Sequence, residues 1–198
     1  MMFNINEVPI FPLNFVLFPD SFLPLKIFEP RYIDMVSKCM KDSLEFGVIL
    51  SRESNDPKMF ETYNIGTMAK IIDWEQGNDG LLGITTIGTN KFKLLGMNKQ
   101  EDGLNIGDVE IIEREGDFKP TENFSNLVSL LKAILDDINL YNDDEKKFES
   151  ASWVSFRFAE ILPLKLEDKQ KCLEIDDPII RLNYLEPLIR MIRENSQQ

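Results

Sequence analysis

The residues best suited by type to acid–base chemistry are three runs of adjacent carboxylates, Asp136-Asp137, Asp143-Asp144-Glu145 and Asp176-Asp177. A general acid requires a carboxyl group in a dry site that raises its pKa. These runs lie in polar stretches, where both members of a pair would ionise. We therefore expect solvated surface residues and helix caps at these positions.

Catalysis with a histidine base is excluded, because the chain contains no histidine. This removes every Ser-His and Cys-His mechanism. Cys39 and Cys172 lie far apart in the sequence, and neither belongs to a C-x-x-C pair. Two cysteines without histidine cannot supply the four ligands of a structural zinc ion, so we predict no metal site.

Phosphate-binding and nucleophile motifs are also missing. Gly83 and Gly88 have the spacing of a nucleotide-binding loop, but Thr89-Asn90 follow where that loop needs Lys-Ser or Lys-Thr. Neither G-x-G-x-x-G nor G-x-S-x-G occurs. A Ser-Lys dyad needs no histidine, so composition leaves it open, although no serine stands in a recognisable nucleophile context. We predict a protein that is not an enzyme and uses no cofactor.

The charge balance is strongly acidic, with a formal net charge of −12 and a pI near 4.5. A nucleic-acid binder normally carries a basic surface. The best local basic cluster is Lys91, Lys93 and Lys99, and alternating lysines on a strand are usually its solvated face. We therefore do not expect nucleic acid as a partner.

The N-terminus lacks the positively charged start of a signal peptide, and Pro9, Pro12 and Pro19 interrupt the apolar stretch that follows. No segment approaches the ~20 apolar residues that span a bilayer. We expect a cytoplasmic protein without a membrane partner, in which both thiols stay reduced.

The sequence changes character near residue 117. All ten glycines lie at or before Gly116, among short runs rich in Ile, Val, Leu and Phe. After that point the apolar residues take helical spacing. The pattern predicts an α+β fold, with a β-rich barrel or curled sheet over residues 1–118 and an α-helical bundle over residues 119–198.

In the first lobe, prolines such as Pro12 and Pro24 confine two extended segments to sheet edges or strand ends. Pro30 predicts a helix start, because proline is tolerated at the first helical position, and Glu29 lies at the positive end of the helix dipole. Gly77-Asn78-Asp79-Gly80 predicts a hairpin turn. The expected helix covers residues 30–41, and the expected strands cover residues 8–13, 22–28, 45–52, 66–74, 81–87, 90–97 and 106–113.

In the second lobe we expect helices over residues 124–138, 142–162 and 167–175 and a last helix from Asp177, with Pro178 at its first position and a kink at Pro187. The side chains expected in the core of the first lobe are large and apolar. They are Phe11, Leu17, Phe18, Leu25 and Ile27. Trp74 and Trp153 are expected to pack inside their own lobes.

Three strings near the N-terminus carry a family signal: Phe11-Pro12-Leu13, Leu17-Phe18-Pro19, and L-P-L-K-I-F-E-P-R-Y over residues 23–32. Their order and spacing resemble the opening of the Lon protease N-terminal domain family. Gly66-Thr67-x-Ala69 and Gly88-x-x-Lys91-Phe92 are similar to two later strands of that family, with Lys91 where arginine is usual. The similarity continues through the helical part to about residue 185.

The resemblance implies a PUA-like β-lobe followed by a helical bundle, in a free-standing member without ATPase and peptidase domains. It also implies a non-catalytic module that binds unfolded or exposed polypeptide. Such a module would be an adaptor or holdase in protein quality control, with a protease or a chaperone as a candidate partner. RNA binding through the PUA-like lobe is the alternative, and the oligomeric state stays open.

The residues expected to contact a peptide are Pro24, Phe28, Glu29, Arg31 and Tyr32. Glu29 and Arg31 have two interpretations. In the structural one, they start the helix with a charge pair or a clasp to a neighbouring loop. In the functional one, Arg31 and Tyr32 line a peptide groove.

Overall fold

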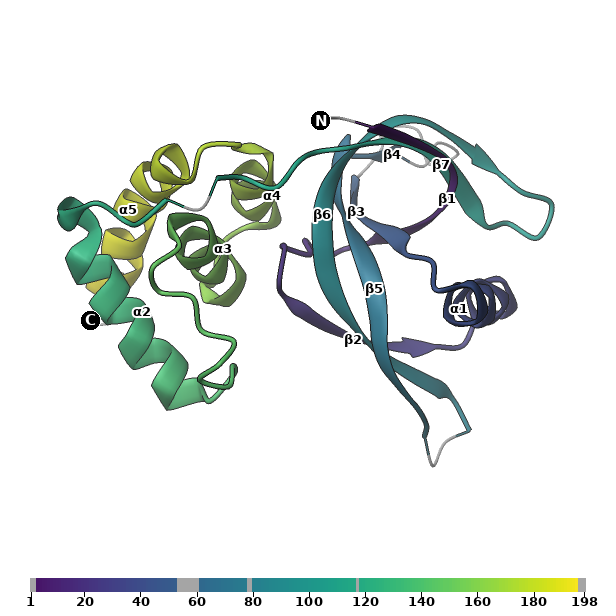
Figure 1. Ribbon diagram of the computed structural model, residues 1–198, viewed down its shortest axis with the longest axis horizontal. Coiled ribbons are helices and arrows are strands. Elements are labelled where there is room, and N and C mark those ends of the chain that lie inside the picture. The colour runs from purple at the N-terminus through teal and green to yellow at the C-terminus, as the bar shows by residue number, and fades with distance from the viewer. Residues whose placement is uncertain (1–2, 53–60, 78–79, 117, 196–198) are drawn as a thin grey trace. The chain divides into compact units, whose positions relative to one another are not determined.

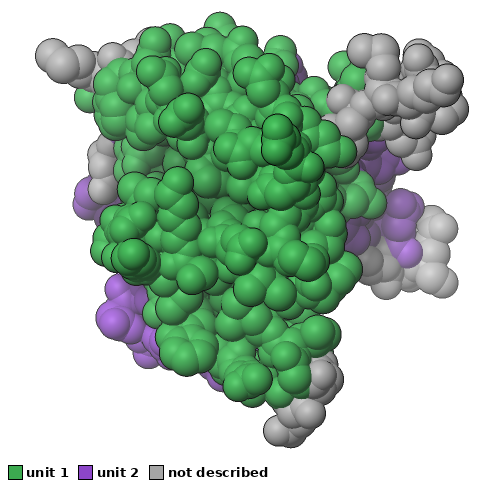
Figure 2. Space-filling view, turned by 90° about the vertical axis from the view of Figure 1, so that its right-hand side faces the viewer, with its two compact units in different colours: residues 1–114 green, residues 115–198 purple. Residues whose placement is uncertain are grey.

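The computed structural model describes residues 3–52, 61–77, 80–116 and 118–195 (Figure 1). The chain divides into two compact units, Met1–Arg114 and Glu115–Gln198, which Figure 2 colours separately. Strands dominate unit 1 and helices dominate unit 2, which confirms the expected α+β class. The expectation that residues 1–118 and 119–198 are the two domains stays a prediction.

The described strands of unit 1 form one curled sheet. They are β1 (Phe3–Leu13), β2 (Phe22–Ile27), β3 (Phe46–Arg52), β4 (Glu61–Thr62), β5 (Ile65–Gln76), β6 (Leu82–Lys99) and β7 (Asn105–Ile111).

A parallel pairing closes this sheet into a barrel. The strand order is β1-β7-β6-β5-β3, and β1 also pairs with β3 over the register Ile10↔Gly47 to Leu13↔Leu50. Closure leaves no open edge within this ring of strands. β2 lies off the ring and pairs antiparallel with the first part of β6, with Pro24 opposite Thr85.

The prediction of separate strands over residues 81–87 and 90–97 is wrong, because β6 runs without a break for 18 residues. Gly88 lies near its middle. A Cβ atom added there would stand 2.2 Å from the backbone oxygen of Phe18. Glycine at this position therefore permits a close backbone approach rather than a turn.

Helix α1 (Pro30–Asp42) begins with proline at its first position, as predicted, and ends at Ser43 in a left-handed conformation with φ 53°. Tyr32 and Val36 of this helix are buried together with Phe11 and Phe46. The rings of Phe11 and Tyr32 stack with their centroids 4.0 Å apart.

The predicted core side chains Phe11, Leu17, Phe18 and Ile27 are buried, whereas Leu25 is half-buried. Leu25 lies on β2, which covers the barrel without belonging to its ring. Leu23 and Ile27 on the same strand are buried, whereas Leu25 lines two surface hollows.

Unit 2 consists of a short 3-10 helix η1 (Glu122–Phe124) and four α-helices. These are α2 (Ser125–Ile138), α3 (Ala151–Ile161), α4 (Leu166–Glu174) and α5 (Pro178–Asn195). Helix α3 contacts the other three α-helices, and every residue from Trp153 to Ala159 is buried. Pro187 lies inside α5 as predicted.

The predicted helix start at residues 142–144 is wrong, because α3 begins at Ala151 with Ser150 as its cap. The Ser150 hydroxyl accepts a hydrogen bond of 3.2 Å from the Trp153 amide. The segment before it stays irregular, and its aromatic side chains Tyr141 and Phe148 pack edge-on against the Trp153 ring. Tertiary packing thus outweighs local capping propensity here.

Trp153 is buried as predicted, but the same prediction is wrong for Trp74, which is 57% exposed. The second half of β5 extends beyond the barrel core, as Figure 1 shows. The predicted hairpin turn lies partly outside the described residues, at 78–79. Its described flanks pair Gln76 with Leu82.

Candidate functional site

Four of the five predicted contact residues line one groove on unit 1. Phe28, Glu29, Arg31 and Tyr32 border this hollow, which has a volume of about 470 Å³ and which we call the β2 groove. Its apolar lining comes from β1 and β2, including Phe11, Leu13, Leu25 and Ile27. Phe28 is 67% exposed and supplies a large aromatic surface beside the groove.

Arg31 forms one wall of the β2 groove. Its guanidinium lies 2.6 Å from the Glu29 carboxylate and donates a hydrogen bond of 2.6 Å to the carbonyl oxygen of Gly103. The guanidinium carbon also stands 4.7 Å from the centre of the Tyr32 ring. Both parts of the structural interpretation are confirmed, the charge pair and the clasp to a neighbouring loop.

Tyr32 also lines the β2 groove, and most of its side chain is buried. Burial raises the pKa of its hydroxyl, the Arg31 charge opposes that effect, and the Glu29 charge adds to it. The hydroxyl therefore stays protonated at neutral pH and can serve only as a hydrogen-bonding group.

The strand beside the groove, β2, lies at the margin of the sheet. β2 pairs with β6, and in the described part of the chain no strand pairs with its other edge. Such an edge presents backbone N–H and C=O groups to an incoming strand. Pro24 lacks a backbone donor, so it shortens the stretch that could pair.

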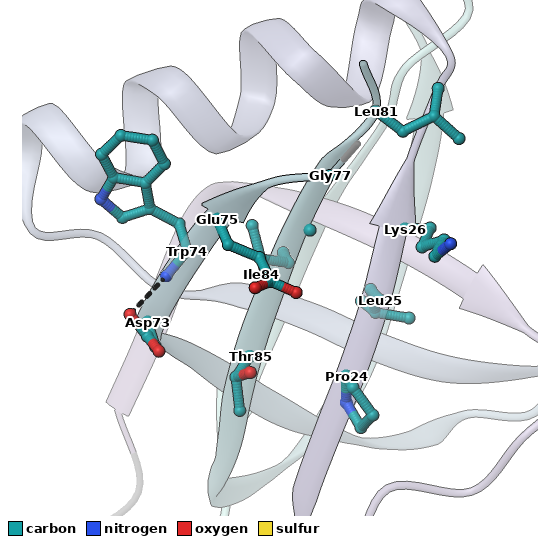
Figure 3. A pocket seen from close by; sticks show the side chains of 11 residues that line it. Pro24, Leu25, Lys26, Asp73, Trp74, Glu75, Gly77, Leu81, Ile84 and Thr85 are labelled. Carbon is teal, nitrogen blue, oxygen red and sulfur yellow. Dashed lines mark hydrogen bonds between the residues drawn. The ribbon is translucent and has the colours of Figure 1, made fainter. Parts of the chain in front are cut away.

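Pro24 lies apart from the other four residues and lines a second hollow of about 570 Å³, which Figure 3 shows. Leu25 and Lys26 line both hollows. The second hollow lies over β5, β6 and β2, where Glu75, Gly83 and Lys26 occupy one row of the sheet. Since Gly83 has no side chain, the row has a gap, and the Glu75 side chain lies over it in Figure 3.

Sequence reasoning missed an exposed apolar patch on the same unit. Met40, Leu44, Ile72 and Trp74 are each between 39% and 57% exposed and line a third hollow between the end of α1 and β5. Trp74 connects this patch to the second hollow, and Figure 3 shows its indole ring pointing away from Glu75. Contiguous apolar surface of this kind marks interaction sites. The position of Trp74 three residues before a glycine turn was the available signal.

Two of the groups considered for catalysis, Asp136 and Asp143, form ion pairs with the same side chain, Lys146, at 2.8 and 3.0 Å. Asp136, Asp137, Asp143, Asp144, Asp176 and Asp177 are exposed and Glu145 is half-buried. Asp177 caps α5 by accepting hydrogen bonds from the amides of Ile179 and Ile180. Among the described residues, no group of three or more acidic or cysteine side chains could hold a metal ion.

The expected solvated row of lysines is wrong at Lys91, which is 4% exposed, whereas Lys93 and Lys99 are exposed. Lys91 pairs with Thr67 of β5 and thus lies within the ring of strands, whereas Lys99 stands at the end of β6. The three lysines therefore do not form one basic surface. No helix in the described ranges is both long and apolar enough to cross a membrane.

Comparison with known proteins relates this chain to Lon proteases. Residues 7–190 match the family described as the ATP-dependent protease La (LON) substrate-binding domain. Lon protease 1 of Bacillus subtilis is 27% identical over 96% of this chain, and the Lon protease of Cytophaga hutchinsonii is 26% identical over 91%. The chain spans about a quarter of the length of these relatives, 26% and 23% respectively.

Solved structures give the same result for the fold. A Lon N-terminal domain protein from Xanthomonas campestris superposes with a TM-score of 0.78 at 31% identity, covering 91% of this chain and 97% of that one. The N-terminal domain of the Mycobacterium avium complex Lon protease superposes with a TM-score of 0.63 at 15% identity, covering 91% and 96%. The family match covers nearly the whole chain, and it confirms the resemblance carried by residues 11–32. This chain belongs to the family of Lon substrate-binding domains.

Proposed function

We propose that this chain is a non-catalytic polypeptide-binding module that takes extended segments along the outer edge of β2. The observation that carries the proposal is the juxtaposition of that edge with the apolar β2 groove. In this arrangement Phe28, Arg31 and Tyr32 contact the bound segment, with Glu29 holding Arg31 and Pro24 limiting the pairing at one end.

The physical basis is addition of a strand to an exposed sheet edge. Main-chain hydrogen bonds give affinity without regard to sequence, and pockets beside the strand select alternate side chains. β2 offers six residues of edge, and the groove of about 470 Å³ lies directly beside its second half. Unfolded chains can use both the strand edge and the groove, since their backbone groups are available for hydrogen bonds and their apolar side chains are exposed.

The family description supports a role in substrate recognition. The finer proposal is that the module serves as an adaptor or a holdase, with a protease or a chaperone as partner, in the cytoplasm. Free, buried Cys39 and Cys172 are compatible with a reducing compartment. RNA binding has no support from the family match, and the acidic charge opposes it.

The test is an anisotropy titration of a labelled, permanently unfolded protein with this chain, beside its folded counterpart and an RNA oligonucleotide. Phe28→Ala is the informative variant, and Phe3→Ala is its matched control. Both phenylalanines are exposed on unit 1, at 67% and 56%, and only Phe28 lines the groove.

We expect selective binding of the unfolded chain, weakened about fivefold or more by Phe28→Ala and unchanged by Phe3→Ala. Tighter, salt-sensitive binding to RNA would show that the proposal is wrong. Equal losses of affinity in the two variants would show that the binding surface is not the β2 groove.

A further inference from the structure

We infer that the β2 groove selects segments in which an acidic side chain stands beside a large apolar residue. This inference rests on the proposed function and names the class of segment bound. It comes from the charges around the groove, whose lining includes the cations Lys26, Arg31 and Lys99 and one carboxylate, Glu29. The groove is thus locally cationic in a chain whose net charge is −12.

The cations of the lining do not contribute equally. Arg31 is paired with Glu29 at 2.6 Å, so these two charges largely offset each other. Lys99 lies at the end of β6, is exposed, and forms no ion pair within the described part of the chain. It is the cation whose charge is most available to a ligand.

The turn after Lys99 does not cancel that charge at the groove. Neither Glu101 nor Asp102 lines the hollow. The Asp102 carboxylate instead accepts a hydrogen bond of 2.8 Å from the Leu104 amide, inside the turn. The cationic side of the groove is therefore bordered by apolar walls, and low-dielectric walls strengthen the attraction between a cation and an anion.

Geometry favours an internal acidic side chain over a chain terminus. The groove runs beside the outer edge of β2, where an extended segment can enter and leave. Side chains two positions apart in such a segment point to the same face, so an apolar residue in the groove and a carboxylate at its rim can be separated by one residue. A bound segment of this kind would place an aromatic or aliphatic side chain near Phe28 and its carboxylate toward Lys99.

The experiment uses capped peptides that are identical except at one position beside a Phe-Leu pair, where they carry Glu, Gln or Lys. Acetylated and amidated ends remove terminal charges. A fourth peptide carries Gln and a free terminal carboxylate. The protein variants are Lys99→Gln and its matched control Lys93→Gln, since Lys93 is exposed on the same strand but outside the groove.

We expect the Glu peptide to bind tightest and the Lys peptide weakest, with the difference shrinking at high salt. Lys99→Gln should weaken binding of the Glu peptide about three- to fivefold and leave the Gln peptide unchanged. Lys93→Gln should change neither, although it removes the same charge from the chain.

Equal affinity for the three capped peptides would overturn the charge inference while leaving polypeptide binding intact. Preference for the fourth peptide over the Glu peptide would assign the cationic rim to a chain terminus and overturn it as well. Absence of binding by every peptide, together with no binding of the unfolded protein, would instead defeat the proposed function itself.

Discussion

Arg31 donates a hydrogen bond of 2.6 Å from its guanidinium to the carbonyl oxygen of Gly103, a residue 72 positions later in the chain. The bond connects the first turn of α1 to the turn between β6 and β7. Gly103 has a φ of 87°, a conformation that other residues rarely adopt. One wall of the β2 groove is therefore assembled by folding, before any ligand is present.

Replacing Arg31 by alanine is expected to lower the free energy of unfolding by about 1–3 kcal/mol. The substitution removes the Gly103 hydrogen bond, the Glu29 ion pair and the contact with the Tyr32 ring. Thermal unfolding of the variant measures the loss, with Arg193→Ala, an exposed arginine of α5, as the control. An unchanged melting temperature together with lost peptide binding would assign Arg31 to ligand contact instead.

Much of the fold follows from local rules in the sequence. Proline at position 30 fixes a helix start because its φ already suits a helix, and the change in glycine content near residue 117 separates strands from helices. The continuous β6 was not predictable in this way. Gly88 indicates the end of a strand unless the close approach of the Phe18 backbone is known. The late start of α3 likewise depends on packing, since the Trp153 ring contacts Tyr141 and Phe148 of the irregular segment before the helix.

The candidate site was predicted less completely. The string around residues 28–32 located one wall of the groove, since the helix start and the charge pair are both local. Lys99 could not be assigned to the groove from the sequence, because only strand pairing brings it near Arg31. The separation of Pro24 into another hollow depends on where the hollows lie along β2, and the alternation of side chains does not predict it, since Lys26, on the same face as Pro24, lines both hollows.

The buried ion pair between Arg181 and Glu115 is expected to matter more for stability than any surface pair. Arg181 is fully buried, and its guanidinium also donates to the Cys172 carbonyl at 2.7 Å and to the Ser155 hydroxyl at 2.9 Å. Arg181→Met should cost about 3–5 kcal/mol, because it leaves the Glu115 carboxylate buried without its cationic partner. Denaturant unfolding provides the measurement.

The double variant Arg181→Met with Glu115→Gln separates charge from packing. Removing both charges avoids the uncompensated carboxylate, so the double variant should be more stable than Arg181→Met alone. Strictly additive losses in the two single variants would show that the ion pair contributes no coupling energy.

Two glycines on β6 are expected to differ in how much stability the protein loses when each is replaced by alanine. At Gly88 the added Cβ atom would meet the Phe18 backbone oxygen at 2.2 Å, whereas at Gly96 nothing lies within 4 Å. The Gly88 backbone also exchanges hydrogen bonds with Ser21 and Asp20, at 2.9 and 2.8 Å, so it cannot easily move away. Gly88→Ala should cost about 2–3 kcal/mol, and Gly96→Ala should stay within about 0.5 kcal/mol of the parent protein. Similar melting temperatures for the two variants would contradict the close approach at Gly88.

Cys172 is expected to make stability fall at alkaline pH. Burial raises the pKa of its thiol from 9.0 to about 12, against the opposing charge of Arg181. The folded state therefore holds this proton more tightly than the unfolded state does. The resulting stabilisation is fully present below pH 9 and is lost as the pH rises toward 12. Unfolding by urea can be measured at a series of pH values from about 8 to about 10. The free energy of unfolding should fall more steeply with pH for the parent protein than for Cys172→Ala, and the difference in slope should approach about 1.4 kcal/mol per pH unit at the limit.

The burial of Cys172 also predicts that a thiol reagent labels it only as fast as the helical unit opens. Rapid labelling of the folded protein would contradict the burial of this thiol.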